Sequence, residues 1–228
     1  MSRLTVYDSK LHGEINLPVS KSEAHRAVIC SSLARNSIDA IDLGLETTLP
    51  DDILITRKAM KDLLSDIHMI FCGESGSTLR FLIPIAAALG KNVIFTGAGR
   101  LPLRPLKEYA QSFSDNGAIL KFPENDSQYL PLEVKGRLRP GIYKLPGNVS
   151  SQYVSGLLMS LPLLNAESRI IITSGLESSG YVDMTVEVMS EFGVKVTRSG
   201  NDFIIEGEQA YKDIDYTCLL YTSPSPRD

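Results

Sequence analysis

The stretch Ser20-Lys21-Ser22-Glu23-Ala24-His25-Arg26 decides how the N-terminal part of this chain folds. It leads into an apolar run, and Ser20 stands three residues before Glu23, which is the spacing of a helix capping box. We therefore predict a helix that begins at Ser20 and runs to about Ala34. The start of a helix leaves backbone N–H groups without partners and carries the positive end of the helix dipole, so it favours a bound anion.

Three side chains of this stretch would strengthen such an anion site. Lys21 lies in the first turn of the predicted helix, and Ser22 and Arg26 are four residues apart, so they share one face. An ammonium, a hydroxyl and a guanidinium would then meet a phosphate or a carboxylate. The alternative is a capped helix whose basic side chains are only solvated, and the stretch by itself does not decide between the two.

Composition limits the kinds of function that the chain can have. With 228 residues, 43% of them hydrophobic, it suits one large domain or two small ones. Its net charge of −4 argues against a nucleic-acid-binding surface, so any basic site must be local. The 3 cysteines are widely spaced and form no C-x-x-C pair, which predicts reduced thiols in a cytoplasmic protein rather than a disulfide framework or a zinc site. The longest apolar run, Phe81–Leu89, is far too short to span a membrane, and the N-terminus lacks the apolar core of a signal peptide.

The predicted helices and strands recur three times along the chain. We predict first helices that begin near residues 20, 75 and 150, and second helices that begin near 51, 104 and 182. Strands are predicted within 3–19 and at 38–43, 67–72, 92–96, 118–122, 132–135, 169–174, 195–199 and 202–206. Each unit reads β-α-β-α-β-β, which indicates an α/β domain with helices packed on sheets. The functional candidates stand at helix starts in all three units, so we expect them to gather near one end of the domain.

The sequence makes specific predictions for one strand and two helices. The strand at 67–72 is predicted to be short and buried. In the second unit we predict a helix over Leu79–Leu89 and another that opens at Arg104-Pro105 and runs to about Asn116, because proline is favoured at the first position of a helix.

A loop of small residues, 73–78, comes before the first helix of the second unit. Its glycines would let backbone N–H groups approach an anion closely, and its hydroxyls add donors. Ser75 invites comparison with the G-x-S-x-G nucleophile elbow of serine hydrolases, but that pattern requires glycine where Ser77 stands. A plain turn that caps a helix explains the loop equally well.

The remaining candidates also stand at the starts of helices. Arg100 and Arg104 lie in the loop 97–105, and guanidinium groups bind carboxylates through two parallel hydrogen bonds. In the third unit, Ser150-Ser151-Gln152 and Ser178-Ser179-Gly180-Tyr181 supply hydroxyl and amide groups. Each of these features has an ordinary alternative, a surface loop or a common helix cap.

Taken together, the motifs resemble the EPSP synthase (3-phosphoshikimate 1-carboxyvinyltransferase) family over about residues 3–217. The motifs that carry the resemblance are Lys21-Ser22-x-x-x-Arg26, Gly76-Ser77-x-x-Arg80-Phe81-Leu82, Arg100-Leu101-x-x-Arg104-Pro105, Ser150-Ser151-Gln152 and Ser178-x-x-Tyr181-x-Asp183. The resemblance implies an enolpyruvyl transferase-type α/β domain, with three β-α-β-α-β-β units around a pseudo-threefold axis, in a two-domain enzyme.

The same resemblance implies an activity and a set of site residues. The activity is transfer of the enolpyruvyl group of phosphoenolpyruvate to the 5-hydroxyl of shikimate 3-phosphate, by a cytoplasmic protein that is monomeric at full length, without metal or cofactor and without nucleic-acid or membrane partners. The residues implied to hold shikimate 3-phosphate are Ser22, Arg26, Ser150, Ser151, Ser178 and Tyr181. Lys21, the catalytic candidate, and Gln152 would touch both substrates. Gly76 and Arg104 would hold phosphoenolpyruvate, and Arg80 would support the loop.

Two other functions remain as alternatives. The related UDP-N-acetylglucosamine enolpyruvyl transferases typically have asparagine after the first lysine and a reactive cysteine in the arginine loop, whereas this chain has Ser22 and no cysteine within 97–105. A half-domain that binds shikimate 3-phosphate without catalysis is the second alternative.

The family resemblance also predicts how the chain divides. Residues 1–19 are expected to pack with a second domain, and residues 20–217 to form the domain that carries the motifs. Residues 218–228 do not follow the family pattern and are expected to be disordered. The family's acidic proton-transfer residues belong to the second domain, so we expect this chain alone to be inactive.

Overall fold

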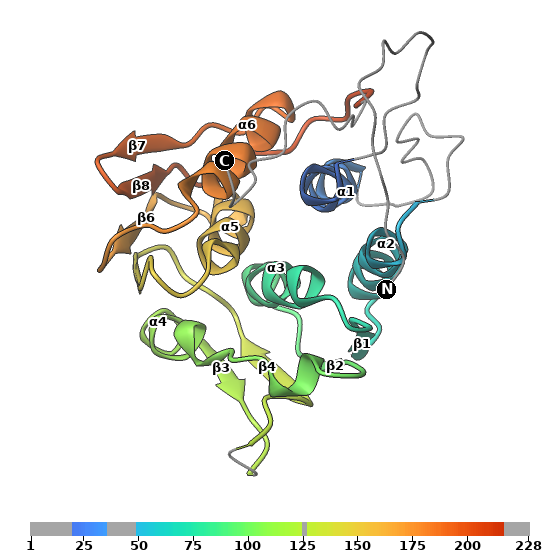
Figure 1. The fold of residues 1–228 in the computed structure, drawn as a ribbon. Helices are drawn as coiled ribbons and strands as arrows, with labels where there is room; N and C mark the ends of the chain where they lie inside the picture. Colours follow the sequence, from blue (N-terminus) through green and yellow to red (C-terminus); the bar gives the residue numbers. More distant parts are fainter. Residues whose placement is uncertain (1–19, 36–48, 125–126, 217–228) are drawn as a thin grey trace, which may run out of the picture.

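The computed structural model describes residues 20–35, 49–124 and 127–216. The strands predicted within 3–19 and at 38–43, and the tail 218–228, lie outside these residues. The elements in chain order (Figure 1) are α1 Lys21–Arg35, α2 Asp51–Leu64, β1 Met69–Phe71, α3 Gly76–Ala88, β2 Val93–Thr96, the 3-10 turns η1 Leu101–Leu103 and η2 Lys107–Tyr109, α4 Ala110–Asp115, β3 Ala118–Lys121, β4 Leu132–Gly136, β5 Ile142–Leu145, α5 Ser151–Ser160, the 3-10 turn η3 Leu161–Leu163, β6 Ser168–Ile172, α6 Ser179–Glu191, β7 Thr197–Ser199 and β8 Asp202–Ile205.

Two four-stranded sheets share one topology. Their strand orders are β1-β2-β4-β3 and β5-β6-β8-β7. In each sheet the first pair is parallel and the other two pairs are antiparallel. The parallel pairs are joined through α3 and α5, as parallel strands require a crossover. The α/β class is confirmed, and the second and third units have the predicted β-α-β-α-β-β order, with β5 as a strand that the element prediction above lacks.

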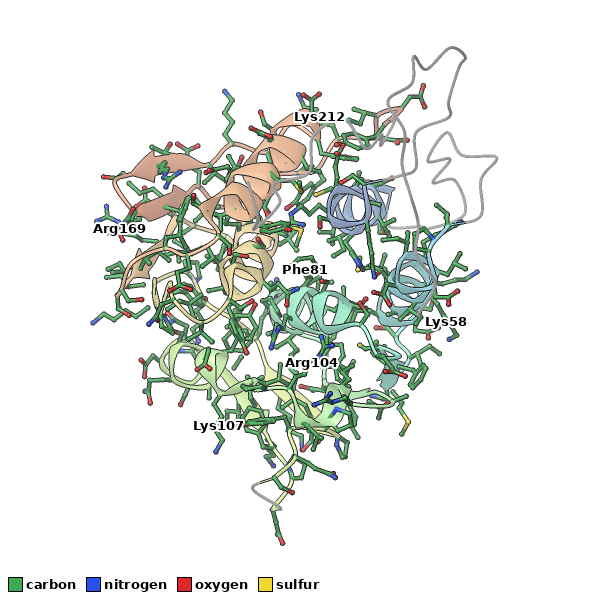
Figure 2. All side chains as sticks on the ribbon, viewed as in Figure 1. Lys58, Phe81, Arg104, Lys107, Arg169 and Lys212 are labelled. Atoms are coloured by element: carbon green, nitrogen blue, oxygen red, sulfur yellow. The ribbon has the colours of Figure 1, made fainter. Side chains whose placement is uncertain are left out.

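Helices α1, α2, α3, α5 and α6 pack against one another, and the two sheets lie to one side of this group, with β6, β7 and β8 on the left and β1 to β4 below (Figure 1). Helix α3 packs against α5, and α1 contacts both α2 and α6. Gly156 on α5 allows α3 to approach closely, because a methyl group there would come within 2.7 Å of the Arg80 carbonyl oxygen on α3. Figure 2 shows Phe81 among the helices, where it is 1% exposed, and Lys58 and Arg169 on the outside.

The capped start predicted at Ser20 is present. The Glu23 backbone N–H donates to Ser20 Oγ at 3.4 Å, and helix α1 begins at Lys21. The Glu23 carboxylate accepts a 2.7 Å hydrogen bond from the Tyr216 hydroxyl and so fastens the C-terminal segment to α1. Cys30 and Cys72 are buried free thiols, and burial raises the pKa of both. None of the helices described has the length and apolar character needed to cross a membrane.

The prediction of a buried strand at 67–72 was wrong in length and in burial. Strand β1 is the edge strand of its sheet, and only its middle residue, Ile70, is buried. Met69 is 59% exposed and Phe71 is 46% exposed. Successive side chains of a strand point to opposite faces, and here one face is not covered. An apolar run does not reveal this asymmetry.

In the second unit the first helix begins near residue 75, as the repeat predicts, whereas the narrower bound at Leu79 and the start of the second helix were displaced. Helix α3 begins at Gly76 rather than Leu79, because Ser75 is its N-cap and accepts the Thr78 backbone N–H at 3.3 Å. The helix predicted from Arg104 is one 3-10 turn, η2, followed by the short α4, so the helical part begins at Lys107. Arg104 is extended (φ −79°, ψ 131°), which is the conformation that a following proline imposes.

Candidate functional site

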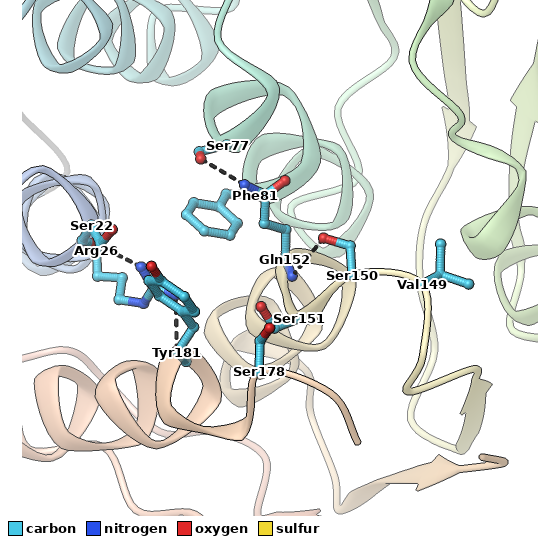
Figure 3. A pocket seen from close by; sticks show the side chains of 10 residues that line it. All are labelled: Ser22, Arg26, Ser77, Phe81, Val149, Ser150, Ser151, Gln152, Ser178 and Tyr181. Carbon is cyan, nitrogen blue, oxygen red and sulfur yellow. Dashed lines mark hydrogen bonds between the residues drawn. The ribbon is translucent and has the colours of Figure 1, made fainter. Parts of the chain in front are cut away.

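A cleft of about 370 Å³ lies where the first turns of four helices meet (Figure 3). It is lined by Ser22, Arg26, Ser77, Phe81, Val149, Ser150, Ser151, Gln152, Ser178 and Tyr181. These residues come from α1, α3, α5 and α6 and the loops before them. Seven of the candidate residues predicted at helix starts line this one cleft, so the prediction that they gather is confirmed for these seven. They are Ser22, Arg26, Ser150, Ser151, Gln152, Ser178 and Tyr181. Among the described residues that line the cleft none carries a carboxylate, although the whole chain is acidic.

Arg26 is the cation of this cleft. Its side chain is 3% exposed and stacks over the ring of Phe81, with 5.2 Å from the guanidinium carbon to the ring centre. Burial lowers the pKa of Arg26 to about 10, so the side chain still carries its charge at neutral pH. A buried charge is costly unless it is paired.

Only neutral groups accept hydrogen bonds from Arg26 within the described residues. Nε donates to Thr185 Oγ1 at 2.6 Å, and Nη2 donates to the Tyr181 carbonyl oxygen at 2.9 Å and to Ser155 Oγ at 3.3 Å. Nη1 donates to the Ser22 carbonyl oxygen. The guanidinium is therefore held firmly by neutral acceptors, and the nearby Glu23 carboxylate offsets its charge only in part, which leaves it suited to an anionic ligand.

Four hydroxyl groups of the cleft have no hydrogen-bond partner among the described residues: those of Ser22, Ser151, Ser178 and Tyr181. Ser178 is the N-cap of α6, yet its side chain makes no capping bond, and its backbone is left-handed (φ 55°, ψ 42°). Such a conformation costs about 1 kcal/mol or more in a residue other than glycine. Free donors at the starts of α5 and α6, together with the Arg26 charge, form a site for an oxyanion such as a phosphate.

Gln152 is fixed in place by its neighbours. Its Nε2 donates to Ser77 Oγ at 2.9 Å, and its Oε1 accepts from Arg80 Nη1 at 2.6 Å. Arg80 also donates to the Pro105 carbonyl oxygen at 3.2 Å and lies 5.0 Å above the Tyr153 ring centre. Arg80 therefore ties α3 to α5 and to the arginine loop, which is the supporting role predicted for it.

Gly76 and Arg104 lie together, outside the lining of the cleft. A methyl group at Gly76 would come within 2.5 Å of Arg104 Nη1, so the exposed Arg104 side chain passes directly over the first turn of α3. Ser77, the next residue, lines the cleft. Their predicted role in holding phosphoenolpyruvate stays a prediction.

Lys21 does not line the cleft. Its ammonium forms an ion pair with the Asp52 carboxylate at the start of α2. Of the three groups of the opening stretch, the Ser22 hydroxyl and the Arg26 guanidinium therefore meet at the cleft, and the Lys21 ammonium is held beside it. The role predicted for Lys21 with both substrates stays a prediction.

Two lining residues, Phe81 and Val149, were not assigned a role from the sequence, and Ser77 was named only as one of the hydroxyl donors of the loop 73–78. Ser77 and Phe81 are four residues apart and so face the same side of α3, a spacing that would have indicated them. Phe81 forms the apolar wall behind the Arg26 guanidinium, and the His25 ring meets it edge-on at 6.4 Å.

The serine hydrolase alternative does not fit the structure. Ser75 is 3% exposed, and its Oγ accepts the Thr78 backbone N–H as a helix cap. Its hydroxyl is therefore not presented to a substrate. Among the described residues, no group of three His, Cys, Asp or Glu side chains is arranged to hold a metal ion.

Comparison with known proteins agrees with the sequence motifs. A family model described as EPSP synthase (3-phosphoshikimate 1-carboxyvinyltransferase) matches residues 42–219. The chain is 40% identical over 243 residues to the 3-phosphoshikimate 1-carboxyvinyltransferase of Clostridium beijerinckii, covering 95% of this chain and 54% of the relative. The corresponding protein of Clostridioides difficile is 40% identical over 248 residues, with 95% and 55% covered.

A solved structure of EPSP synthase from Acinetobacter baumannii has the same fold. It superposes with a TM-score of 0.68 at 19% identity, covering 88% of this chain and 48% of that chain. The chain spans about half the length of the curated relatives that it matches. Because the family model covers most of the residues, including α2 to α6, the chain belongs to the EPSP synthase family.

Proposed function

We propose that the cleft binds shikimate 3-phosphate and that, in an enzyme with both halves of the family's length, the bound substrate receives the enolpyruvyl group of phosphoenolpyruvate. One observation carries this proposal. Among the described residues, the buried guanidinium of Arg26 donates hydrogen bonds only to neutral acceptors, and the cleft that it faces is lined by four free hydroxyls and by no carboxylate. That chemistry suits a small, multiply charged, hydroxylated ligand.

The reaction explains why such a site is needed. The 5-hydroxyl oxygen of shikimate 3-phosphate attacks C2 of phosphoenolpyruvate and loses its proton, while C3 gains a proton. Phosphate then leaves the tetrahedral intermediate, and loss of a proton from C3 restores the double bond. Both substrates carry a phosphate and a carboxylate, so helix N-termini and cations must offset their repulsion when they meet.

The roles of the individual residues follow from their places. Arg26, Ser22, Ser150, Ser151, Ser178 and Tyr181 would bind and orient shikimate 3-phosphate. Gln152, fixed by Arg80 and Ser77, would stand between the two substrates. Arg104 beside Gly76 would bind phosphoenolpyruvate, and Lys21 would leave Asp52 to reach the ligands. Positioning of this kind contributes a large part of the rate in reactions of two substrates.

Calorimetric titration of the chain with shikimate 3-phosphate tests the proposal. We expect binding by the unaltered chain, a loss of at least tenfold in affinity for Arg26→Ala, and little change for Arg198→Ala. Arg198 is a suitable control because it is an exposed arginine whose charge is paired with Asp183. Since guanidinium and ammonium differ in geometry, Arg26→Lys should recover only part of the affinity.

Two further titrations and one turnover assay test the alternatives. Shikimate without its phosphate should bind much more weakly, and UDP-N-acetylglucosamine should not bind. Because the chain spans about half the length of its relatives, we expect negligible turnover when phosphoenolpyruvate is added. Binding of UDP-N-acetylglucosamine in place of shikimate 3-phosphate, or equal binding by Arg26→Ala, would overturn the proposal.

We further propose that residues 20–217 act as one domain of a monomeric cytoplasmic enzyme that does not bind nucleic acid. The net charge of −4 supports the absence of a nucleic-acid-binding surface.

A further inference from the structure

Two hydroxyl groups lie behind Arg26, on the side away from the cleft lining. They belong to Ser155 on α5 and Thr185 on α6, and both residues are 0% exposed. Their oxygens are 2.7 Å apart, and each accepts a hydrogen bond from the Arg26 guanidinium. Neither residue lines the cleft, and no role was predicted for either one.

The hydrogen atoms of this cluster can be assigned by counting. The single hydroxyl hydrogen of Thr185 is directed to the Tyr181 carbonyl oxygen at 2.8 Å. The Ser155 hydroxyl must then donate to Thr185 Oγ1, because Thr185 has no second hydrogen to give. Thr185 Oγ1 consequently uses both of its lone pairs, one for Ser155 and one for the Nε–H of Arg26. Every polar atom of the pair is satisfied, and the plane of the guanidinium is determined.

We propose that Thr185 and Ser155 are positioning residues, which hold the Arg26 guanidinium in line with the cleft and leave its charge available to the anionic ligand. An acidic residue in the same place would hold Arg26 equally well but would neutralise it. Neutral acceptors fix the direction of the donors without competing for the charge. This inference rests on the proposed function of the cleft.

A second pair of buried hydroxyl groups, those of Thr56 and Thr78, lies beside a histidine instead of an arginine. Thr56 on α2 is also 0% exposed and also donates to the carbonyl oxygen four residues back, that of Asp52. It lies 2.7 Å from the Thr78 hydroxyl on α3, and 2.8 Å from Nδ1 of His25. Thr56 therefore provides a matched control for Thr185, because neither Thr56 nor Thr78 touches Arg26 or lines the cleft.

The test compares Thr185→Val with Thr185→Ser, Ser155→Ala and Thr56→Val, by titration with shikimate 3-phosphate. Valine has nearly the shape of threonine but leaves the Arg26 Nε–H without an acceptor. We expect Thr185→Val to weaken binding by about tenfold, which corresponds to about 1.4 kcal/mol, and Ser155→Ala to weaken it less. Thr185→Ser should bind like the unaltered chain, and Thr56→Val should lose stability but no affinity.

A spectroscopic measurement distinguishes positioning from a general loss of stability. The Nε–H signal of Arg26, identified by its loss in Arg26→Lys, should exchange slowly with solvent in the unaltered chain and in Thr185→Ser. In Thr185→Val it should shift and exchange rapidly, while Thr56→Val leaves it unchanged. If Thr185→Val binds the ligand normally, or if Thr56→Val weakens binding as much, the inference is wrong. If the unaltered chain does not bind shikimate 3-phosphate, the proposed function fails, and the Nε–H signal still reports whether Thr185 holds Arg26.

Discussion

The guanidinium of Arg104 lies so close to Gly76 that a methyl group on the glycine would come within 2.5 Å of Nη1. Gly76 is the first residue of α3, and Arg104 comes from the loop after η1. The absence of a side chain at Gly76 therefore allows a cation to lie across the start of a helix, where it is held beside the cleft.

Replacement of Gly76 by alanine should displace Arg104 and leave the fold intact. The clashing atom is the end of a flexible, exposed side chain, so it can move away with little loss of stability. We expect the affinity for phosphoenolpyruvate, measured by titration in the presence of shikimate 3-phosphate, to fall up to about tenfold. Affinity for shikimate 3-phosphate itself should hardly change. Gly175→Ala is the control, because a methyl group at Gly175 meets nothing within 4 Å; an equal effect in both variants would contradict the role of Arg104.

Replacement of Gly156 by alanine, unlike replacement of Gly76, should lower the free energy of unfolding. The added methyl group would come within 2.7 Å of the Arg80 carbonyl oxygen and 2.5 Å of the Tyr109 hydroxyl, and a backbone carbonyl cannot turn aside. Helices α3 and α5 should then separate, at a cost of about 1–3 kcal/mol in the free energy of unfolding. Urea denaturation would measure this loss. Because Gln152 on α5 bonds Ser77 on α3, binding of shikimate 3-phosphate should weaken as well.

His25 should make the fold sensitive to acid. The side chain is 2% exposed, and burial lowers its pKa to about 4 from 6.5. The unfolded chain therefore takes up a proton at this residue before the folded chain does. The contribution of neutral His25 to the free energy of unfolding is therefore fully present above pH 6.5. It is lost as the pH falls toward 4, and the loss amounts to roughly 3 kcal/mol.

Denaturation curves recorded from pH 7 to pH 4 would check this expectation. His25→Gln should retain a hydrogen bond to Thr56 and should lose much less stability over this range than the unaltered chain. His68→Gln, a change at an exposed histidine, should keep the full acid sensitivity. An equal loss in His25→Gln and the unaltered chain would show that another group is responsible.

The ion pair between Lys21 and Asp52 should compete with ligand binding. Both side chains are partly exposed, at 53% and 29%, so the pair itself is worth at most about 1 kcal/mol. Asp52→Asn should free the Lys21 ammonium and raise the affinity for shikimate 3-phosphate by up to about fivefold, as titration at low salt would show. Asp62→Asn, which breaks the exposed pair with Lys58, should have no effect. A weaker affinity in Asp52→Asn would mean that Asp52 orients Lys21 toward the ligand instead.

Elements with local signals could be predicted from the sequence. The cap at Ser20, the proline before α2 and the serine before α5 all act within one turn of the backbone, and each marks a helix that is present. The failures lie where distant residues decide. The exposure of Met69 and Phe71 depends on the position of β1 at the edge of a sheet, which no neighbouring residue reveals.

The site divides in the same way. By itself, the sequence determined that basic and hydroxyl side chains stand at helix starts in each of three units, because capping and periodicity are local properties. Only the tertiary structure decided which of them meet: Arg26 lies in the cleft over Phe81, whereas Lys21, five residues earlier on the same helix, pairs with Asp52. Positions on one helix point in different directions, and the partner that each side chain reaches is set by how α1 packs against α2, α3 and α6. That packing is the reason why the hydrogen bonds of the Arg26 side chain go to neutral acceptors.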